Sequence, residues 1–315
     1  MFYFEYFFIG LILNLIIFKL ISPFLKTHFL INPIKISSHK KPTPSGAGLS
    51  FVISTVIIAV YSGLVNGFSF IENFILLSTV LSLVGILDDY FCLSRILRFL
   101  MQLIVVSLII SLSPFSGLNL VLLSFICFLG VSIVNLINFT DGIDGLLAGS
   151  ILVSLIGANL YLSISPLFVA LSAGLLIFLF LNWHPSKFFM GDAGSLFLGA
   201  IYFGIILTSN NFEEMIRIFL LATPLFADTT FCILKRFFSN ENIFKGHNKH
   251  LFQRLVRGGM SHSKVSIIYI AASFLLALVN YFSNLYMLIT CSILVIAIGF
   301  YVDRYAVDFY SDKKL

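Results

Sequence analysis

Eleven long apolar runs divide the sequence and constrain its fold more than any other feature. Each run is about 17–25 residues long, the length that an α-helix needs to cross the hydrocarbon core of a membrane. The chain of 315 residues is 59% hydrophobic and only 10% charged, which excludes a soluble globular enzyme. The sequence therefore predicts an all-α integral membrane protein with about eleven transmembrane helices. The runs fall near residues 3–22, 47–65, 69–87, 96–113, 117–137, 145–163, 165–182, 193–209, 214–234, 264–282 and 284–302.

The connections between these runs indicate a single domain. Most are short and carry Gly, Pro, Asn or Ser, as turns do. The longest, residues 235–263, is too short to form a core of its own. We therefore expect residues 1–315 to form one polytopic membrane domain. The first run lacks a small-residue cleavage pattern, so we expect a membrane span there rather than a removable signal peptide. The four cysteines are scattered, and their spacing predicts neither a disulfide framework nor a zinc site.

The basic residues predict how the chain is oriented in the membrane. If alternate connections share a face, 18 of the 19 Lys and Arg residues lie on one face and only Arg217 lies on the other. Because cytoplasmic loops carry the excess of positive charge, the N-terminus is expected outside and the C-terminus in the cytoplasm. The net charge of +5 thus follows membrane topology, and we expect no nucleic-acid partner.

Acidic and imidazole side chains gather on the same face. An ion or proton pathway would more often place its acids near the bilayer centre, so a transporter is the weaker interpretation. A non-enzymatic membrane scaffold would not need three separate Asp motifs on one face. We predict an active site on the cytoplasmic face, formed by loops near residues 23–46, 88–95, 138–145, 183–192 and 235–263. The acids and histidines concerned are Asp88, Asp89, Asp141, Asp144, Asp192, Asp228, His39, His184, His247, His250 and His262.

Two motifs place pairs of carboxylates at predicted helix ends. Asp88 and Asp89 begin "DDYFCLSRILRFLMQ", where adjacent side chains on a helix point in different directions, so that one can face a metal or phosphate. The alternative is a solvated helix end neutralised by Arg95 and Arg98. In "NLINFTDGIDGL", residues 135–146, Asn and Asp recur at every third position. Its glycines favour an unwound turn, and an ordinary turn sequence is the alternative.

Two further motifs predict anion binding. "FFMGDAGSLFLG" places Asp192 between glycines at the start of the eighth run, where backbone N–H groups attract anions, although Asp192 could also be a plain N-cap. Asn182 and Lys187 lie close before it in the sequence. The basic loop "GHNKHLFQRL" contains His247, His250 and Arg254, which predict either a phosphate clamp or a loop lying on anionic lipid. Carboxylates beside phosphates suit Mg²⁺ better than Zn²⁺. We expect phosphoryl chemistry on a lipid substrate.

The ordered motifs "HKKPTPSGAG", "DDYFCLSRILRFLMQ", "NLINFTDGIDGL", "FFMGDAGSLFLG", "PLFADTTFCILKR" and "HNKHLFQRL" carry a family resemblance across residues 39 to about 264. The chain resembles the polyprenyl-phosphate N-acetylhexosamine-1-phosphate transferase superfamily of integral membrane enzymes. That resemblance implies transfer of a sugar-1-phosphate from a UDP-N-acetylhexosamine to undecaprenyl phosphate, with Mg²⁺ and release of UMP. It implies a location in the bacterial cytoplasmic (inner) membrane. The resemblance is also compatible with Mn²⁺ as a substitute for Mg²⁺. It is compatible with a homodimer as well.

The resemblance also implies roles for individual residues. Asp192 is expected to bind Mg²⁺, and Asp88 and Asp89 to handle the metal and the lipid phosphate. Asn138 and Asp141 are expected near the phosphates, and His250 is the histidine of the last loop. Asp144 and Phe189 match the nucleoside pocket, and Asn182 matches a position next to that pocket. Lys41 matches the basic position before the Pro-rich turn.

The sequence departs from the family pattern at two points. Gly46-Ala47-Gly48 stands where the family has two adjacent glycines, and the last loop lacks a His-rich cluster of the N-acetylglucosamine type. This loop looks more like the branch that initiates O-antigen with N-acetylfucosamine or N-acetylquinovosamine donors. The expected role is therefore the initiating step of O-antigen or other envelope polysaccharide synthesis. The alternatives are the same reaction in peptidoglycan or teichoic acid synthesis.

Overall fold

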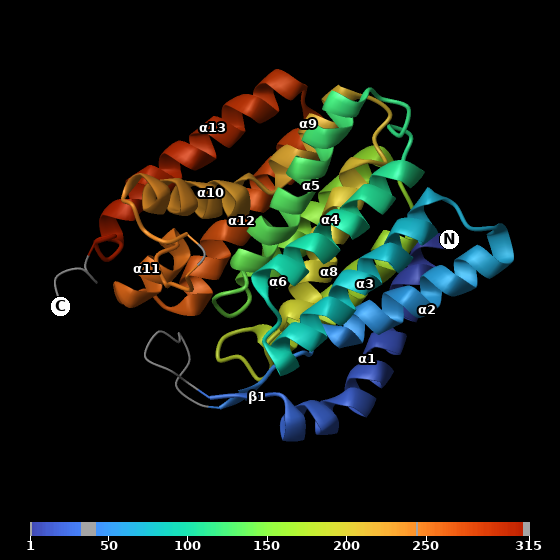
Figure 1. The fold of residues 1–315 in the computed structure, drawn as a ribbon, viewed down its shortest axis with the longest axis horizontal. Coiled ribbons are helices and arrows are strands. Elements are labelled where there is room, and N and C mark those ends of the chain that lie inside the picture. The colour runs from blue at the N-terminus through green and yellow to red at the C-terminus, as the bar shows by residue number, and fades with distance from the viewer. Residues whose placement is uncertain (1, 33–41, 244, 311–315) are drawn as a thin grey trace.

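The computed structural model describes residues 2–32, 42–243 and 245–310, and it is almost entirely helical (Figure 1). Two short strands, β1 and β2, pair antiparallel with Leu30 opposite Pro44. The all-α fold class is confirmed. The elements are α1 (Phe2–His28), β1 (Leu30–Ile31), β2 (Thr43–Pro44), α2 (Leu49–Asn66), α3 (Phe70–Phe91), α4 (Arg95–Leu112), α5 (Leu120–Phe139), α6 (Leu146–Leu162), α7 (Pro166–Asn182), α8 (Asp192–Ile206), α9 (Phe212–Leu221), α10 (Thr223–Phe238), α11 (Leu251–Arg257), α12 (His262–Phe282), α13 (Leu285–Val302) and the 3-10 helix η1 (Asp303–Tyr305).

Seven helices within the described residues are long and apolar enough to cross a membrane: α1 to α5, α12 and α13. The bent pair α9 and α10 makes an eighth candidate, while α6, α7 and α8 are apolar but shorter. Every predicted run falls on one helix or on this pair, so the chain is an integral membrane protein. The count of eleven spans and the orientation remain predictions.

Helix α8 is short because protein, and not lipid, surrounds it. All of its residues after Asp192 are buried, and it packs between α3 and α5 (Figure 1). Outer helices instead expose large apolar side chains, as lipid-facing surfaces do; Phe4 on α1 is 70% exposed and Tyr286 on α13 is 80% exposed. With 15 residues, α8 is roughly 22 Å long, and its enclosure frees it from matching the membrane thickness.

The predicted single helix over residues 214–234 is wrong, because the structure breaks it at Ala222. Helices α9 and α10 meet there at 78°. Pro224 lies in the first turn of α10, where its missing N–H and fixed φ are tolerated, whereas inside a continuous helix they would break it. The break turns α10 across the direction of its neighbours (Figure 1). A further short helix, α11, forms inside the predicted loop over residues 235–263.

Glycines let three helix ends approach at one point. A Cβ added to Gly85 of α3 would lie 2.4 Å from the backbone nitrogen of Ala193 at the start of α8. A Cβ on Gly48, which precedes α2, would lie 2.6 Å from the Cα of Gly194. Small residues of this kind allow helices in membranes to pack backbone against backbone. The end of α3 and the starts of α2 and α8 therefore meet.

Arg217 of α9, the one basic residue predicted on the outer face, is only 3% exposed. Its Nε donates to Asn280 Oδ1 at 3.1 Å, and its Nη2 donates to the carbonyl of Ser283 at 2.7 Å. Its guanidinium also lies 4.5 Å from the ring centroid of Tyr161. Arg217 thus satisfies backbone carbonyl groups at the end of α12, which have no partner within the helix.

Candidate active site

Four predicted acids lie where the glycine-packed helix ends meet. Asp88 and Asp89 occupy the last turn of α3, Asp141 lies in the turn after α5, and Asp192 begins α8. Burial, and then the carboxylates of Asp192 and Asp89, raise the pKa of Asp141 to about 7. Arg98 of α4 forms an ion pair with Asp88 and lies 3.9 Å from Asp192 Oδ2. We call Asp88, Asp89, Asp141 and Asp192 the carboxylate cluster.

The start of α8 is shaped by Gly191, which occupies the N-cap position at φ +74°. A Cβ there would lie 2.9 Å from Asp89 Oδ2, so glycine keeps this carboxylate close to the helix start. The alternative that Asp192 is a plain N-cap is wrong, because Asp192 is the first helical residue and makes no capping hydrogen bond. Its carboxylate is therefore available for another role.

Asn138 and Asn182 both lie at the site, but they form hydrogen bonds with different segments of the chain. Ser195 of α8 donates to Asn138 Oδ1 at 2.5 Å, which fixes Asn138 beside the start of α8. Asn182 at the end of α7 accepts from the backbone N–H of Gly145 and donates to the carbonyl of Phe188, both at 2.9 Å. Asn182 thus joins the turn after α5 to the segment before α8.

The unwound turn predicted between Asn138 and Gly145 is confirmed. Helix α5 ends at Phe139 and α6 begins at Leu146, with Gly145 at φ +76°. A Cβ at Gly145 would lie 2.8 Å from the indole ring of Trp183. The glycine therefore allows both the left-handed backbone and the close approach of the segment after α7.

Asp144, expected in the nucleoside pocket, is held by two histidines that the sequence placed on the active-site face without a role of their own. Its Oδ2 lies 2.6 Å from His184 Nδ1, and its backbone N–H donates to His262 Nδ1 at 3.3 Å. Burial alone would raise the pKa of Asp144, but the imidazoles of His262 and His184 outweigh it and hold the pKa below its usual value. These histidines lie 118 and 40 positions away in the chain, so no sequence spacing joins them to Asp144.

Phe189, the other residue expected in the nucleoside pocket, lies in an extended segment between Asn182 and Asp192. Its backbone N–H donates to the carbonyl of Pro44 at 2.8 Å, and its carbonyl accepts from Ala47 at 3.0 Å. This pairing places the Pro-rich turn beside the site. Lys41, predicted to act from the same turn, lies outside the described residues.

His250 begins α11, and its ring stacks on Phe252 with 5.3 Å between ring centroids. Burial is the main cause that lowers the pKa values of His247 and His250, each to about 3, and nearby cations add to it, so both rings are neutral. Asp228 accepts from the backbone N–H groups of Leu251 and Phe252 at 2.7 and 3.1 Å. Asp228 therefore stabilises the start of α11.

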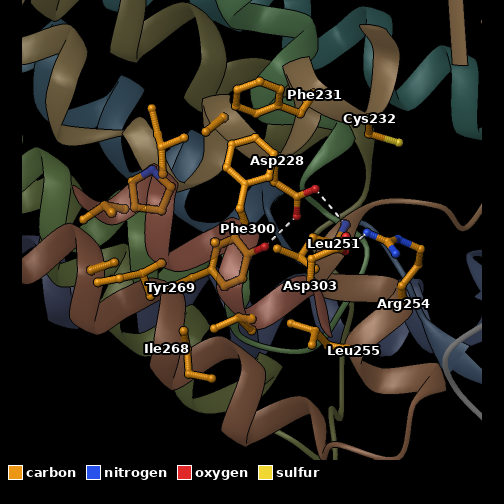
Figure 2. Close-up of a pocket in the computed structure, with 18 of the residues that line it drawn as sticks. Asp228, Phe231, Cys232, Leu251, Arg254, Leu255, Ile268, Tyr269, Phe300 and Asp303 are labelled. Carbon is orange, nitrogen blue, oxygen red and sulfur yellow. Dashed lines mark hydrogen bonds and ion pairs between the residues drawn. The ribbon is translucent and has the colours of Figure 1, made fainter. Parts of the chain in front are cut away.

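Arg254, predicted as part of a phosphate clamp, is not brought to the carboxylate cluster. Its guanidinium pairs with Asp303 and donates to the carbonyl groups of Val307 at 2.9 Å and Lys249 at 3.1 Å. It lines a separate cavity of about 380 Å³ between α10, α12 and α13 (Figure 2). In this conformation, Arg254 fastens α11 to the segment after α13.

A large groove of about 1350 Å³ runs along α4 and α5, and Asp141 is the member of the carboxylate cluster that lines it. At one end it is lined by Asn138, Asp141, His247 and His250, with Arg98 beside them. Most of its remaining wall is apolar and includes Phe99, Leu103, Ile110, Leu120, Leu123 and Phe128. The groove can therefore take a ligand with a charged head and a long apolar tail.

The carboxylate cluster offers oxygen donors of the kind that would suit Mg²⁺. Mg²⁺ prefers oxygen ligands and is often held by one or two carboxylates together with substrate phosphates. Burial is the main cause of the raised pKa of Asp141, and repulsion from the carboxylates of Asp192 and Asp89, which a divalent cation would relieve, adds to it. A second set of donor atoms, from Asp144, His184 and His262, lies within 4.8 Å, but hydrogen bonds already join these residues to one another.

Comparison with known proteins identifies the family of the chain. The model of glycosyl transferase family 4 matches residues 71–210. A probable undecaprenyl-phosphate N-acetylglucosaminyl 1-phosphate transferase from Bacillus subtilis (strain 168) is 32% identical over 303 residues, covering 83% of this chain and 81% of the relative. A decaprenyl-phosphate N-acetylglucosaminephosphotransferase from Mycobacterium leprae (strain TN) is 27% identical over 281 residues, covering 73% and 70%.

A phospho-N-acetylmuramoyl-pentapeptide-transferase from Kosmotoga olearia (strain ATCC BAA-1733 / DSM 21960 / TBF 19.5.1) is 34% identical over 194 residues, covering 53% of this chain and 60% of the relative. The relatives thus differ in the sugar and the lipid that their names give, but all are sugar-phosphate transferases. Together with the family match across α3 to α8, they show that the chain belongs to the polyprenyl-phosphate N-acetylhexosamine-1-phosphate transferase superfamily, within glycosyl transferase family 4.

Proposed function

We propose that this protein transfers an N-acetylhexosamine-1-phosphate from a UDP-sugar to undecaprenyl phosphate, giving undecaprenyl-pyrophosphoryl-sugar and UMP. The observation that carries the proposal is the apolar groove whose polar end is lined by Asp141 of the carboxylate cluster, together with Arg98 and Asn138. A polyprenyl chain matches the apolar wall along α4 and α5, and a phosphate matches the polar end. The membrane fold supplies the environment in which such a lipid is dissolved.

The proposed step exchanges one phosphoanhydride bond for another. An oxygen of the lipid phosphate attacks the β-phosphorus of the UDP-sugar, and the bond from this phosphorus to the bridging oxygen breaks, so that UMP leaves. Because two anions must approach each other, Arg98 and Mg²⁺ are needed to offset their repulsion. Mg²⁺ bound at the carboxylate cluster would supply charge neutralisation at the phosphates.

Asp141 is the candidate base for this step. The structure pairs Asp88 with Arg98, whereas Asp141 lines the groove and has its pKa raised to about 7. A group with this pKa is suited to accept a proton from a lipid phosphate near neutral pH. A covalent phosphosugar on Asp141 or Asp88 is the alternative mechanism, and it predicts exchange of UMP into the UDP-sugar without lipid.

We propose that the reaction occurs on the cytoplasmic face of the bacterial inner membrane and initiates O-antigen or another envelope polysaccharide. The departures in the last loop favour this role over peptidoglycan or teichoic acid synthesis. The deciding experiment offers purified protein a panel of UDP-sugars with undecaprenyl phosphate. Preferred turnover of UDP-N-acetylmuramoyl-pentapeptide would contradict the O-antigen assignment.

A donor labelled in its β-phosphate tests the bond that breaks. The label is expected in the butanol-extractable lipid, with unlabelled UMP in the water phase. An ordinary glycosyltransferase would attack the anomeric carbon and release UDP, and the label would then stay in water. Protein carrying Asp192→Asn, reconstituted in the same vesicles, is the matched control for background transfer.

A further inference from the structure

Three potential metal ligands from two segments of the chain meet beside α10. Cys232 lies in α10, and His247 and His250 lie in the connection that leads back to α11. The Cys232 sulfur and one nitrogen from each ring all lie within 4.8 Å of one another. The two imidazole centroids are 4.9 Å apart. We call these residues the Cys-His-His cluster.

His250 has an imidazole nitrogen that the described part of the chain leaves without a partner. Its side chain is 5% exposed, and its Nδ1 is buried with no hydrogen bond. The nearest carboxylate oxygen, Asp228 Oδ1, is 3.9 Å away and accepts instead from the backbone N–H of Leu251. The other oxygen of Asp228 accepts from the Tyr269 hydroxyl at 2.6 Å. Because buried polar atoms are normally satisfied, this nitrogen points to a missing ligand.

The cations around the Cys-His-His cluster each have a carboxylate partner, although two of them share one. Arg236 and Lys249 both pair with Glu241, at 3.4 and 2.8 Å, and Arg254 pairs with Asp303. Because each is ion-paired, these side chains repel a bound metal ion less strongly than free cations would. Cys232 is buried and forms no disulfide, so its sulfur is available as a thiolate once a metal displaces the proton.

The cluster lies in the wall between two cavities. His247 and His250 line the large groove, and Cys232 lines the smaller cavity on the same side as Arg254 (Figure 2). One thiolate and two imidazoles are ligands that Zn²⁺ prefers, whereas Mg²⁺ prefers oxygen. Three protein ligands leave a fourth position of a tetrahedral site for water entering from the groove.

We propose that Cys232, His247 and His250 form a site for Zn²⁺ or a similar thiophilic transition metal, with ligands distinct from those of the carboxylate cluster. Occupation ties both histidines to the metal and removes them from the polar end of the groove. On the proposed function, this metal therefore inhibits the transferase, and the site makes the enzyme sensitive to transition metals.

Cobalt binding tests the site without any assay of activity. Full-length protein in detergent, with Mg²⁺ present, is titrated with Co²⁺, and the near-ultraviolet thiolate-to-cobalt absorption is recorded. One equivalent is expected to bind with this absorption, and Zn²⁺ is expected to displace it. Cys232→Ser should abolish the absorption, His247→Ala should weaken Co²⁺ binding at least tenfold, and Cys291→Ser on α13 is the matched control. Equal absorption in Cys232→Ser and Cys291→Ser would overturn the site.

Activity measurements test the consequence separately. Zn²⁺ is expected to inhibit transfer by the unsubstituted protein, while Cys232→Ser keeps its basal activity and loses at least tenfold in Zn²⁺ sensitivity. Unchanged inhibition in Cys232→Ser would contradict the inhibitory role. If no UDP-sugar in the panel is turned over, the proposed function fails, whereas cobalt binding still decides whether the metal site exists.

Discussion

Individual carboxylates of the carboxylate cluster differ in their electrostatic surroundings. Asp88 has Arg98 as its ion-pair partner, while Asp141 lies among like charges and holds its proton up to neutral pH. Such an arrangement disfavours the fully ionised protein by itself and favours it when a divalent cation is present. The cluster thus couples protonation, metal binding and substrate charge at single residues.

Asp192→Asn is predicted to lower turnover at least about 100-fold while the protein remains folded. An amide oxygen keeps the size of the carboxylate but loses the charge that holds Mg²⁺, and a bound metal contributes several kcal/mol to phosphoryl transfer. Turnover at several Mg²⁺ concentrations, alongside thermal unfolding, checks this outcome. Near-normal turnover at low Mg²⁺ would remove Asp192 from the metal site.

The pH dependence of metal binding is predicted from Asp141. Its pKa is about 7 in the folded chain, above the ordinary value of roughly 3.9. The folded state therefore binds the extra proton, and this contribution to stability is lost as pH rises toward 7. Mg²⁺ should reverse the trend, so its stabilising effect in thermal unfolding is expected to grow between pH 5.5 and 7.5. If stabilisation by Mg²⁺ increases equally steeply with pH in Asp141→Asn, the pH dependence does not come from Asp141.

At the scale of elements, contacts between helix backbones place the site. The end of α3 and the start of α8 touch through Gly85 and Ala193, and this contact sets the distance from Asp89 to Asp192. The positions of the acids follow from how these helix ends pack. Site geometry is therefore sensitive to side-chain volume at a position that bears no functional group.

Gly85→Ala is predicted to lower both thermal stability and activity. The added methyl would meet backbone atoms 2.4 Å away, and overpacking of this kind costs about 1–3 kcal/mol. Gly299→Ala in α13 is the matched control, because a Cβ there meets nothing within 4 Å of the described chain. The control should be neutral or slightly stabilising, since Ala is the better helix former. Equal stability of the two variants would show that α3 and α8 can separate freely.

The sequence was sufficient to predict helices and motif positions, but not the break in α9–α10 or the partners of Asp144. Apolar runs report helix length directly, and Gly142 and Gly145 indicated the unwound turn. Pro224 could have indicated the break, since proline is tolerated in the first helical turn and ends a preceding helix. His184 and His262 could not be assigned, because tertiary packing of distant segments, and no local period, brings them to Asp144.

The whole molecule is asymmetric in charge, and this asymmetry predicts its orientation. The predicted topology puts 18 of the 19 basic residues on one face, so reporters fused after residue 210 are expected to lie on the outer face of the membrane. Reporters fused after residue 245 or at the C-terminus should read cytoplasmic. The described contacts of Arg217 support this assignment, because burial at the end of α12 explains the one exception. A cytoplasmic signal after residue 210 would contradict the proposed topology.

The buried Arg217 also constrains how the chain is assembled during synthesis. Its hydrogen-bond partner Asn280 lies 63 positions later in the chain, so α9 leaves the ribosome long before α12 can satisfy its charge. Glu213 of the same helix lies 3.8 Å from Arg217 Nη1, but its side chain is 59% exposed, so most donors of the guanidinium still lack acceptors before α12 is made. An incompletely paired arginine is costly in hydrocarbon, and α9 alone has only 10 residues. We therefore expect the pair α9–α10 to stay at the membrane interface or beside the insertion machinery until α12 arrives. Biogenesis of this protein is predicted to end with a cooperative closure of its C-terminal helices around one guanidinium, and not with independent insertion of each span.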